Sequence, residues 1–532
     1  MRKFTFVLAA AMFFASTLFA YEQIGSLNPY AYNVSAAATD STVTVSYNLN
    51  APAVSTEIAI YCNGVEMGTQ AVEDNAVGAH SAVIDLAPYT QGGKYTVGIR
   101  VFGNSYDAPF QLKEIRDNST DTTALCYSFY HPKGVAVDRN PFSPYFGRIL
   151  TDETMEDTPD IGYHSSADRD GIYAFDATFS PIPNGNSMAY KGGLNFSVRM
   201  SDGSTRAYTP YRIVISKDNR IFVSMQDDKI SPLYEVSPDL QTWTPIFSGD
   251  VSDGVIRDAE GRYVSGINCG LDVKGEGEDL EIIMLNTNRS GMWSYDGKGF
   301  MIATYKLGTK TAWTGPATTA DTLAKIVGEG VVPSVGNCGI AYDNVEGYWY
   351  IGNRPQAIEQ RSLVHVNGQK MVDWAISEQD SALFKLNQNG LNGGGNARII
   401  DDMLILGGGQ HAIWTGHLIM LDIKHGENNV PILSPKYDVN LINISRNLND
   451  FAIDFGHNLY TVGNSNEMII PVALPYSGVV ETPVNVEVEK AGNEGVENVQ
   501  SGTQVHKIIR NGQLLILKGG KTYTADGRLV VF

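Results

Sequence analysis

A strand–turn–strand unit recurs six times between residues 119 and 480, and this repeat constrains the fold more than any other feature. Each copy pairs a short apolar run with a turn and a second apolar run, and a third run usually follows. The copies begin at Gly134, Arg212, Gly270, Gly339, Arg398 and Phe451. A single small sheet cannot bury both of its faces, so such sheets pack side by side around an axis. The repeat therefore predicts an all-β chain with a central six-bladed β-propeller over 119–480.

Two features of this region bear on how the ring is counted and closed. The stretch 182–207 is long enough to hold another sheet, which keeps seven blades as an alternative. The last copy has only three apolar runs, and the apolar segment Leu125–Tyr130 precedes the first copy. We therefore predict that 125–130 closes the ring as the outer strand of the last blade.

The flanking regions predict two further β units. Residues 21–118 contain four or more alternating apolar runs within about 80 residues, which is typical of a small β-sandwich. Residues 481–504 are rich in Gly, Glu, Asn and Ser and predict a linker. Residues 505–532 predict three strands, with turns at Asn511-Gly512, Gly519-Gly520 and Asp526-Gly527. Such a short unit has little core of its own, and a β-hairpin that docks on the propeller is an alternative.

Three resemblances accompany these units. The runs at 42–49, 57–64, 82–86 and 92–101 resemble the Ig-like module of flagellar-hook-cap type, which implies a spacer or docking element. The pattern that begins at Pro132 and ends at Asp176 resembles NHL and related six-bladed propellers. Lys507–Leu514, with Gly520–Tyr523 and Asp526–Arg528, resembles the end of the Por (type IX) secretion sorting domain of Bacteroidetes. This last resemblance implies export or surface attachment.

The first twenty residues predict a secretory signal peptide, 1–20. Arg2 and Lys3 precede an apolar run from Phe4 to Phe14, and small residues lead to a cut after Ala20. No later segment reaches the ~20 apolar residues of a membrane-spanning helix. The chain carries a net charge of −19, which becomes −21 without the two basic residues of the signal. Such a chain repels nucleic acid and anionic membranes. We therefore expect a secreted or cell-surface protein without a nucleic-acid partner.

The sequence contains no familiar catalytic motif. A GxSxG nucleophile elbow, HExxH, a P-loop and an EF-hand loop are all missing. This pattern leans away from an enzyme and favours a binding or scaffold protein that uses the propeller to recognise an extracellular glycan or protein. The C-terminal segment would contact the export machinery. The alternative is a metal-dependent propeller enzyme, lactonase- or lyase-like, with its site at the axial mouth.

Two sets of polar residues are candidates for ligand binding at one mouth of the ring. Asn side chains precede several innermost strands, and Arg side chains stand in polar loops where they would grip an acidic ligand. These residues are Asn268, Asn337, Asn396, Asn449, Arg289, Arg354 and Arg446. Asn also caps turns, and Arg also pairs with surface acids, so both structural roles remain open.

Acidic residues supply the candidate metal ligands. Asp152, Asp168 and Asp170 lie in an acid-rich stretch, and Asp272 lies in the third copy. Oxygen ligands at this density predict Ca²⁺, although a solvated loop explains the stretch equally well. Cys269 and Cys338 occupy equivalent places in copies three and four, where either a disulfide or two buried thiols fits.

Overall fold

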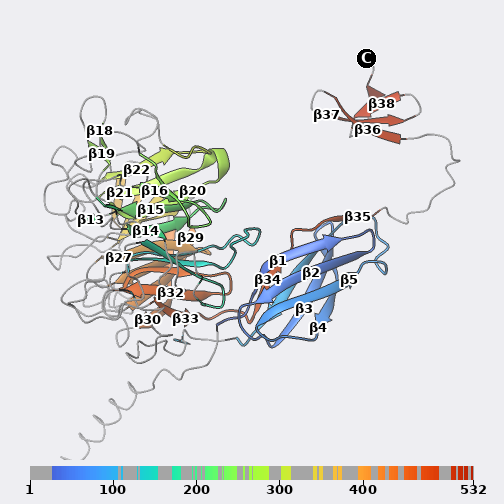
Figure 1. The fold of residues 1–532 in the computed structure, drawn as a ribbon, viewed down its shortest axis with the longest axis horizontal. Helices are drawn as coiled ribbons and strands as arrows, with labels where there is room; N and C mark the ends of the chain where they lie inside the picture. Colours follow the sequence, from blue (N-terminus) through green and yellow to red (C-terminus); the bar gives the residue numbers. More distant parts are fainter. Residues whose placement is uncertain are drawn as a thin grey trace, which may run out of the picture.

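The computed structural model describes most of the chain after residue 26, with gaps. The described residues are 27–105, 110–111, 129, 132–153, 171–180, 182, 194–195, 198–199, 205–206, 210–225, 231, 233–247, 256–257, 263–265, 268–286, 301–312, 340–343, 347–351, 363–367, 370–373, 394–408, 417–425, 431–440, 448–463, 469–490, 505–510, 513–518, 521–524 and 529–530. Their only helical element is a single 3-10 turn, η2 (Gly277–Asp279), and all the others are strands. The all-β prediction is confirmed (Figure 1).

Six small antiparallel sheets make up the central unit, and we call them blades 1 to 6. Blade 1 holds β8 (Val135–Val137), β9 (Ile149–Glu153), β10 (Gly171–Phe175) and β11 (Leu194–Asn195); blade 2 holds β14 (Pro210–Ile215), β15 (Ile221–Met225), β16 (Leu233–Val236) and β17 (Trp243–Pro245); blade 3 holds β20 (Asn268–Lys274), β21 (Glu281–Asn286) and β22 (Met301–Lys306); blade 4 holds β23 (Ile340–Asp343), β24 (Gly347–Ile351), β25 (Leu363–Asn367) and β26 (Lys370–Asp373); blade 5 holds β27 (Gly394–Ile400), β28 (Met403–Gly408), β29 (His417–His425) and β30 (Pro431–Asn440); blade 6 holds β31 (Leu448–Ile453), β32 (Asn458–Gly463), β33 (Ile469–Ala473) and β7 (Phe110–Gln111).

The blades form a closed ring. Their first strands contact one another in the order β8, β14, β20, β23, β27 and β31, and β31 returns to β8. The six-bladed prediction is confirmed, and the seven-bladed alternative is not needed. Within 182–207 the described strands are β11, which completes blade 1, and a two-stranded pair, β12 (Val198–Arg199) and β13 (Thr205–Arg206).

Polar side chains shape the turn after the innermost strands and explain part of the repeat. In blade 1, Asp138 accepts the N–H of Asn140 at 3.0 Å. In blade 2, the Ser216 hydroxyl accepts the N–H of Arg220 at 3.0 Å. In blade 6, Asp454 accepts the N–H of Asn458 at 2.8 Å. Because these short side chains bond the backbone just ahead of them, they fix the turn between the first two strands.

The ring closes with a different segment from the predicted one. The outer strand of blade 6 is β7, which pairs with Val472 and Ala473 of β33. The segment 125–130 was therefore the wrong choice, although the strand does come from the chain ahead of the first blade. Within that segment, Phe129 is described and buried, and its ring packs edge-on to Tyr173, 5.5 Å away.

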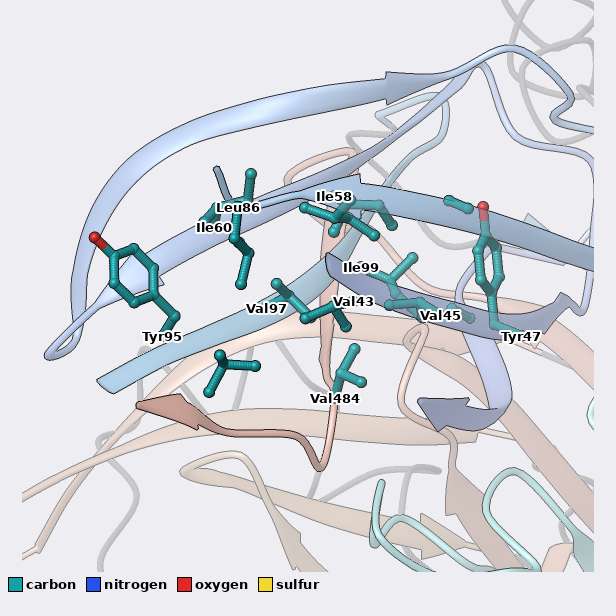
Figure 2. Close-up of a cluster of buried hydrophobic side chains, with 14 of the residues drawn as sticks. Val43, Val45, Tyr47, Ile58, Ile60, Leu86, Tyr95, Val97, Ile99 and Val484 are labelled. Atoms are coloured by element: carbon teal, nitrogen blue, oxygen red, sulfur yellow. The ribbon is translucent and has the colours of Figure 1, made fainter. Parts of the chain in front are cut away.

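A β-sandwich precedes the propeller in the chain. One sheet has the order β1 (Ala31–Ala38), β2 (Thr42–Leu49), β5 (Gly78–Asp85). The other has the order β4 (Val65–Val72), β3 (Ser55–Cys62), β6 (Gly93–Phe102), β34 (Val479–Pro483), and β35 (Val488–Lys490) also pairs with β6. Alternate residues of each strand turn inward, and Figure 2 shows the resulting core, which includes Val45, Ile58, Val97, Ile99 and Val484.

The predicted linker is incorrect at its beginning. Residues 479–483 and 488–490 form β34 and β35, which are part of the sandwich sheet. The propeller is thus inserted between β6 and β34 of one sandwich. Local composition could not reveal this, because β34 pairs with a strand that lies about 380 residues earlier in the chain.

The C-terminal segment folds as one antiparallel sheet with the order β36 (Val505–Arg510), β37 (Gln513–Lys518), β38 (Lys521–Thr524), β39 (Leu529–Val530), one strand more than predicted. The predicted signal peptide and the partner residue Cys338 lie outside the described residues. Of the four cysteines, Cys62 is a buried free thiol. No helix among the described residues is both long enough and apolar enough to cross a bilayer.

Candidate functional site at the axis of the ring

The structure places some of the residues that the sequence nominated. Asp152 and Asp272 are described with their side chains, in β9 and β20. Asn268, Asn396 and Asn449 are described only by their backbone, within the first three residues of β20, β27 and β31. Asn337, Arg289, Arg354, Arg446, Asp168 and Asp170 lie outside the described residues. The ligand-binding role of these Asn and Arg residues stays a prediction.

Five charged side chains from five strands converge near the axis. We call Asp152, Arg212, Asp272, Arg398 and Asp450 the axial cluster. They come from β9, β14, β20, β27 and β31. Innermost strands have one edge that faces the axis and lacks a neighbouring strand, so their backbone groups need other partners. The axial cluster supplies several of these partners.

Arg398 links four blades. Its Nη2 donates to the carbonyl oxygen of Ile213 at 3.0 Å, to that of Val135 at 3.4 Å and to Oδ2 of Asp450 at 2.8 Å. The Arg398 side chain is 12% exposed, whereas Asp450 is fully buried. Asp450 also accepts the N–H of Val135 at 3.1 Å. One guanidinium on blade 5 therefore contacts blades 1, 2 and 6.

Asp272 differs from the other acids of the axial cluster because it is partly exposed, while Asp152 and Asp450 are buried. Its carboxylate accepts the N–H of Val273 at 2.9 Å and, across the blade boundary, the N–H of Tyr342 at 2.6 Å. The deep position of the carboxyl raises its pKa to about 6, while these two N–H groups and the nearby Arg398 charge act to lower it. A carboxyl with this pKa exchanges protons near neutral pH.

Asp152 is enclosed more completely. Its Oδ1 accepts the N–H groups of Lys133 at 2.7 Å and Gly134 at 2.8 Å, and its Oδ2 has no partner among the described residues. Burial raises the pKa of Asp152 to about 8. Glycine is required at 134 because a Cβ there would lie 2.7 Å from Oδ2 of Asp152 and 3.0 Å from the nitrogen of Ile213.

Arg212 is also fully buried. Its Nη1 donates to the carbonyl oxygen of Lys133 at 2.5 Å, and its guanidinium lies 4.5 Å from the centroid of the Tyr211 ring. Within the described part of the chain, its Nε and Nη2 have no partner. Its positive charge acts to lower the pKa of Asp152, against the larger effect of burial.

The predicted calcium ligands do not form a metal site in the described structure. Asp152 and Asp272 belong to blades 1 and 3, and backbone N–H groups bond both oxygens of Asp272 and one of Asp152. Each acid also has a guanidinium nearby, which repels a cation. No three His, Cys, Asp or Glu side chains within the described ranges come together as a possible metal-binding group.

Sequence reasoning missed Arg212, Arg398 and Asp450. The signal was present, because each is a charged residue at the start of an innermost strand that is otherwise apolar. A charge in such a place requires a partner, since burying it alone is costly. This rule would have selected all three.

We expect the Asp152→Asn substitution to flatten the pH dependence of stability. With a folded pKa of about 8 against an ordinary value of 3.8, the folded protein holds this proton up to about pH 8. Its contribution to stability is therefore complete below pH 3.8 and is lost as the pH rises through about 8. Asparagine keeps the acceptor oxygen but does not titrate. Urea unfolding midpoints at pH 5, 7 and 9 measure the effect.

The exposed Asp40→Asn change serves as the control for this series and should leave the profile unchanged. Parallel profiles for the wild type and Asp152→Asn would show that Asp152 does not titrate in this range.

Solved structures offer three likenesses. A luciferin-regenerating enzyme is 11% identical with a TM-score of 0.35, and the match covers 69% of this chain and 97% of that one. The soluble aldose sugar dehydrogenase of Escherichia coli is 12% identical with a TM-score of 0.36, covering 65% and 97%. The calcium structure of a Trichoderma reesei protein of Carbohydrate-Active Enzymes Family AA12 is 10% identical with a TM-score of 0.35, covering 69% and 97%. No family model and no curated protein matches the chain.

These named structures correct one expectation. The sequence leaned away from an enzyme, whereas the luciferin-regenerating protein, the sugar dehydrogenase and the AA12 protein are all named as enzymes. The choice of a reaction for this chain rests on its own residues, and above all on the partly exposed Asp272.

Proposed function

We propose that this chain is an enzyme that acts on a small substrate at the axis of the propeller, with Asp272 as its general acid–base group. One observation carries the proposal: Asp272 is an axial carboxyl that is partly exposed and has a pKa raised to about 6. Raised carboxyl pKa values cluster at active sites, because a group that titrates near the working pH both takes and returns a proton efficiently.

The reaction that best suits these residues is the hydrolysis of a lactone. Ionised Asp272 takes a proton from the attacking water, whose oxygen bonds to the lactone carbonyl carbon. Protonated Asp272 then returns that proton to the ring oxygen as the carbon–oxygen bond breaks. Water and lactone become one hydroxy acid, and Asp272 regains its initial state.

Arg398 is proposed to stabilise the negative charge that develops on the carbonyl oxygen during this step. Its hydrogen bonds to the described residues all run from Nη2, which leaves Nη1 to donate to a substrate. Its Nη2 bonds to three other blades hold the side chain in place before the substrate arrives. A fixed donor of this kind is the main source of electrostatic catalysis in acyl transfer.

Calcium enters the proposal only through residues outside the described part, such as Asp168 and Asp170. Oxygen ligands from those loops would suit it. No step of the proposed reaction depends on a metal.

The predicted export signals complete the proposal. A secretory signal at 1–20 and a sorting segment at 505–532 would place the enzyme outside the cell, where extracellular glycan or protein is the partner proposed from the sequence. An N-terminus that begins at Tyr21 in the exported protein would support the cut after Ala20.

The Asp272→Asn variant tests the function. We expect wild-type residues 21–532 to hydrolyse at least one member of a panel of five- and six-membered lactones, with a rate that rises through about pH 6 as Asp272 ionises. The variant should lower kcat/KM by about a hundredfold or more, the usual contribution of a general acid–base group.

The control is Asp279→Asn, also in blade 3, whose side chain is 87% exposed. It should hydrolyse lactones at the wild-type rate. The proposal fails if no lactone is turned over, or if Asp272→Asn is as active as the wild type while both are folded by circular dichroism.

A further inference from the structure

Both ends of the propeller chain lead into one sheet of the sandwich. The chain leaves β6 at Phe102 to form β7 of blade 6, and it returns from β33 of the same blade into β34. Strands β6 and β34 then pair side by side, from Val479 opposite Phe102 to Pro483 opposite Gly98. Beside this pairing, the N–H of Gly103 donates to the carbonyl oxygen of Gly478 at 2.8 Å. The entry and exit of a segment of 376 residues (103–478) are thus held together.

The strand that closes the ring is short. Only Phe110 and Gln111 of β7 pair with blade 6. A two-residue strand offers few hydrogen bonds against the entropy of holding the ends of so long a segment together. The folded sandwich removes much of this entropic cost, because it already holds the two ends side by side.

Further contacts fix the sandwich to blade 6. The side-chain oxygen of Asn458 accepts the N–H of Asn28 at 2.7 Å, and the Asn458 amide donates to the Asn28 carbonyl at 3.1 Å. The Asn28 amide donates in turn to the carbonyl oxygen of Leu474, the residue that follows β33, at 3.0 Å. The segment before β1 is therefore joined to two parts of the closing blade.

A charged contact on the sandwich holds the returning strand. Arg100 of β6 donates from Nε to Oε2 of Glu481 in β34 at 3.0 Å, and the Tyr61 hydroxyl donates to Oε1 of Glu481 at 2.6 Å. Val484 and Val488, which follow β34 and begin β35, complete the sandwich core. The returning segment is thus held by its backbone, its charge and its apolar side chains.

We infer that the sandwich is an intramolecular clamp that keeps the propeller ring closed, so that the ring opens only when the sandwich comes apart. The clamp does not depend on the proposed enzymatic activity. It gives the sandwich a role in place of the predicted spacer, and it couples the unfolding of two units that the sequence treats as independent.

The tryptophans make this coupling measurable. All six, Trp243, Trp293, Trp313, Trp349, Trp374 and Trp414, lie in the propeller segment. Their fluorescence therefore reports on the propeller alone. Ile58 is fully buried in the sandwich core, so Ile58→Ala weakens the clamp without touching a blade. The control is Val83→Ala in the same sandwich, whose residue is 57% exposed.

We expect Ile58→Ala in the full chain to lower the urea midpoint of the tryptophan signal, with Val83→Ala at the wild-type value. Hydrogen exchange followed by mass spectrometry should show β3, β7 and β31 losing protection together in the Ile58→Ala variant. If exchange in β3 rises while β7, β31 and the tryptophan midpoint stay as in the wild type, the clamp is overturned. A variant too unstable to purify is replaced by the milder Ile58→Val, with the same expected pattern.

Discussion

Replacing Arg398 with methionine is expected to destabilise the propeller by about 3–5 kcal/mol, the usual loss when one partner of a buried ion pair is removed. The change leaves the buried Asp450 carboxylate without its cation and leaves the carbonyl oxygens of Val135 and Ile213 without this donor. Because the lost contacts lie on blades 1, 2 and 6, the loss should weaken the ring as a whole. Urea denaturation followed by tryptophan fluorescence measures it.

A double-mutant cycle separates the ion pair from the packing of the side chain. Asp450→Asn keeps an oxygen that accepts the Val135 N–H but carries no charge. The double variant should therefore be less destabilised than the sum of the two single variants, since no uncompensated charge remains. Strict additivity of the two changes would show that Arg398 and Asp450 do not act as a pair.

The ring could be predicted because its evidence is local and repeated. Each copy carries its own apolar runs and, in several copies, a turn-forming Asp or Ser such as Asp138, Ser216 or Asp454. The closing strand could not be predicted in the same way, because β7 is only two residues long and neither residue carries a signal of its own. The same limit hid β34, whose partner is distant in the chain.

The candidate site was predicted only in part, and for a different chemistry. Asp152 and Asp272 were selected as calcium ligands, yet the structure gives them backbone donors and nearby guanidiniums instead. Which side chains meet at the axis depends on the register of strands in different blades. Asp272, for example, meets the N–H of Tyr342 on the next blade, and no spacing along the chain encodes that contact.

Tyr30 is the second residue at which a large effect is expected. Its side chain is fully buried where the sandwich meets blades 1 and 6, and its ring lies 5.7 Å from that of Phe146 and 6.2 Å from that of Phe455. Gly147 and Gly456 make room for it, since a Cβ at either position would lie 2.7 Å from Tyr30 atoms. We expect Tyr30→Ala to cost about 3–5 kcal/mol, because it leaves a cavity that two glycines cannot fill. Thermal and urea unfolding measure the loss.

The matched variant is Tyr30→Phe, which keeps the ring and removes only the hydroxyl. That hydroxyl is buried and has no hydrogen-bond partner among the described residues, so its removal should change stability by less than about 1 kcal/mol. A loss as large as that of Tyr30→Ala would mean that the hydroxyl, and not the ring, holds the junction. If instead Tyr30→Ala is neutral, the aromatic contacts are dispensable, and the attachment of the sandwich to blade 6 must rest on the Asn28–Asn458 bonds.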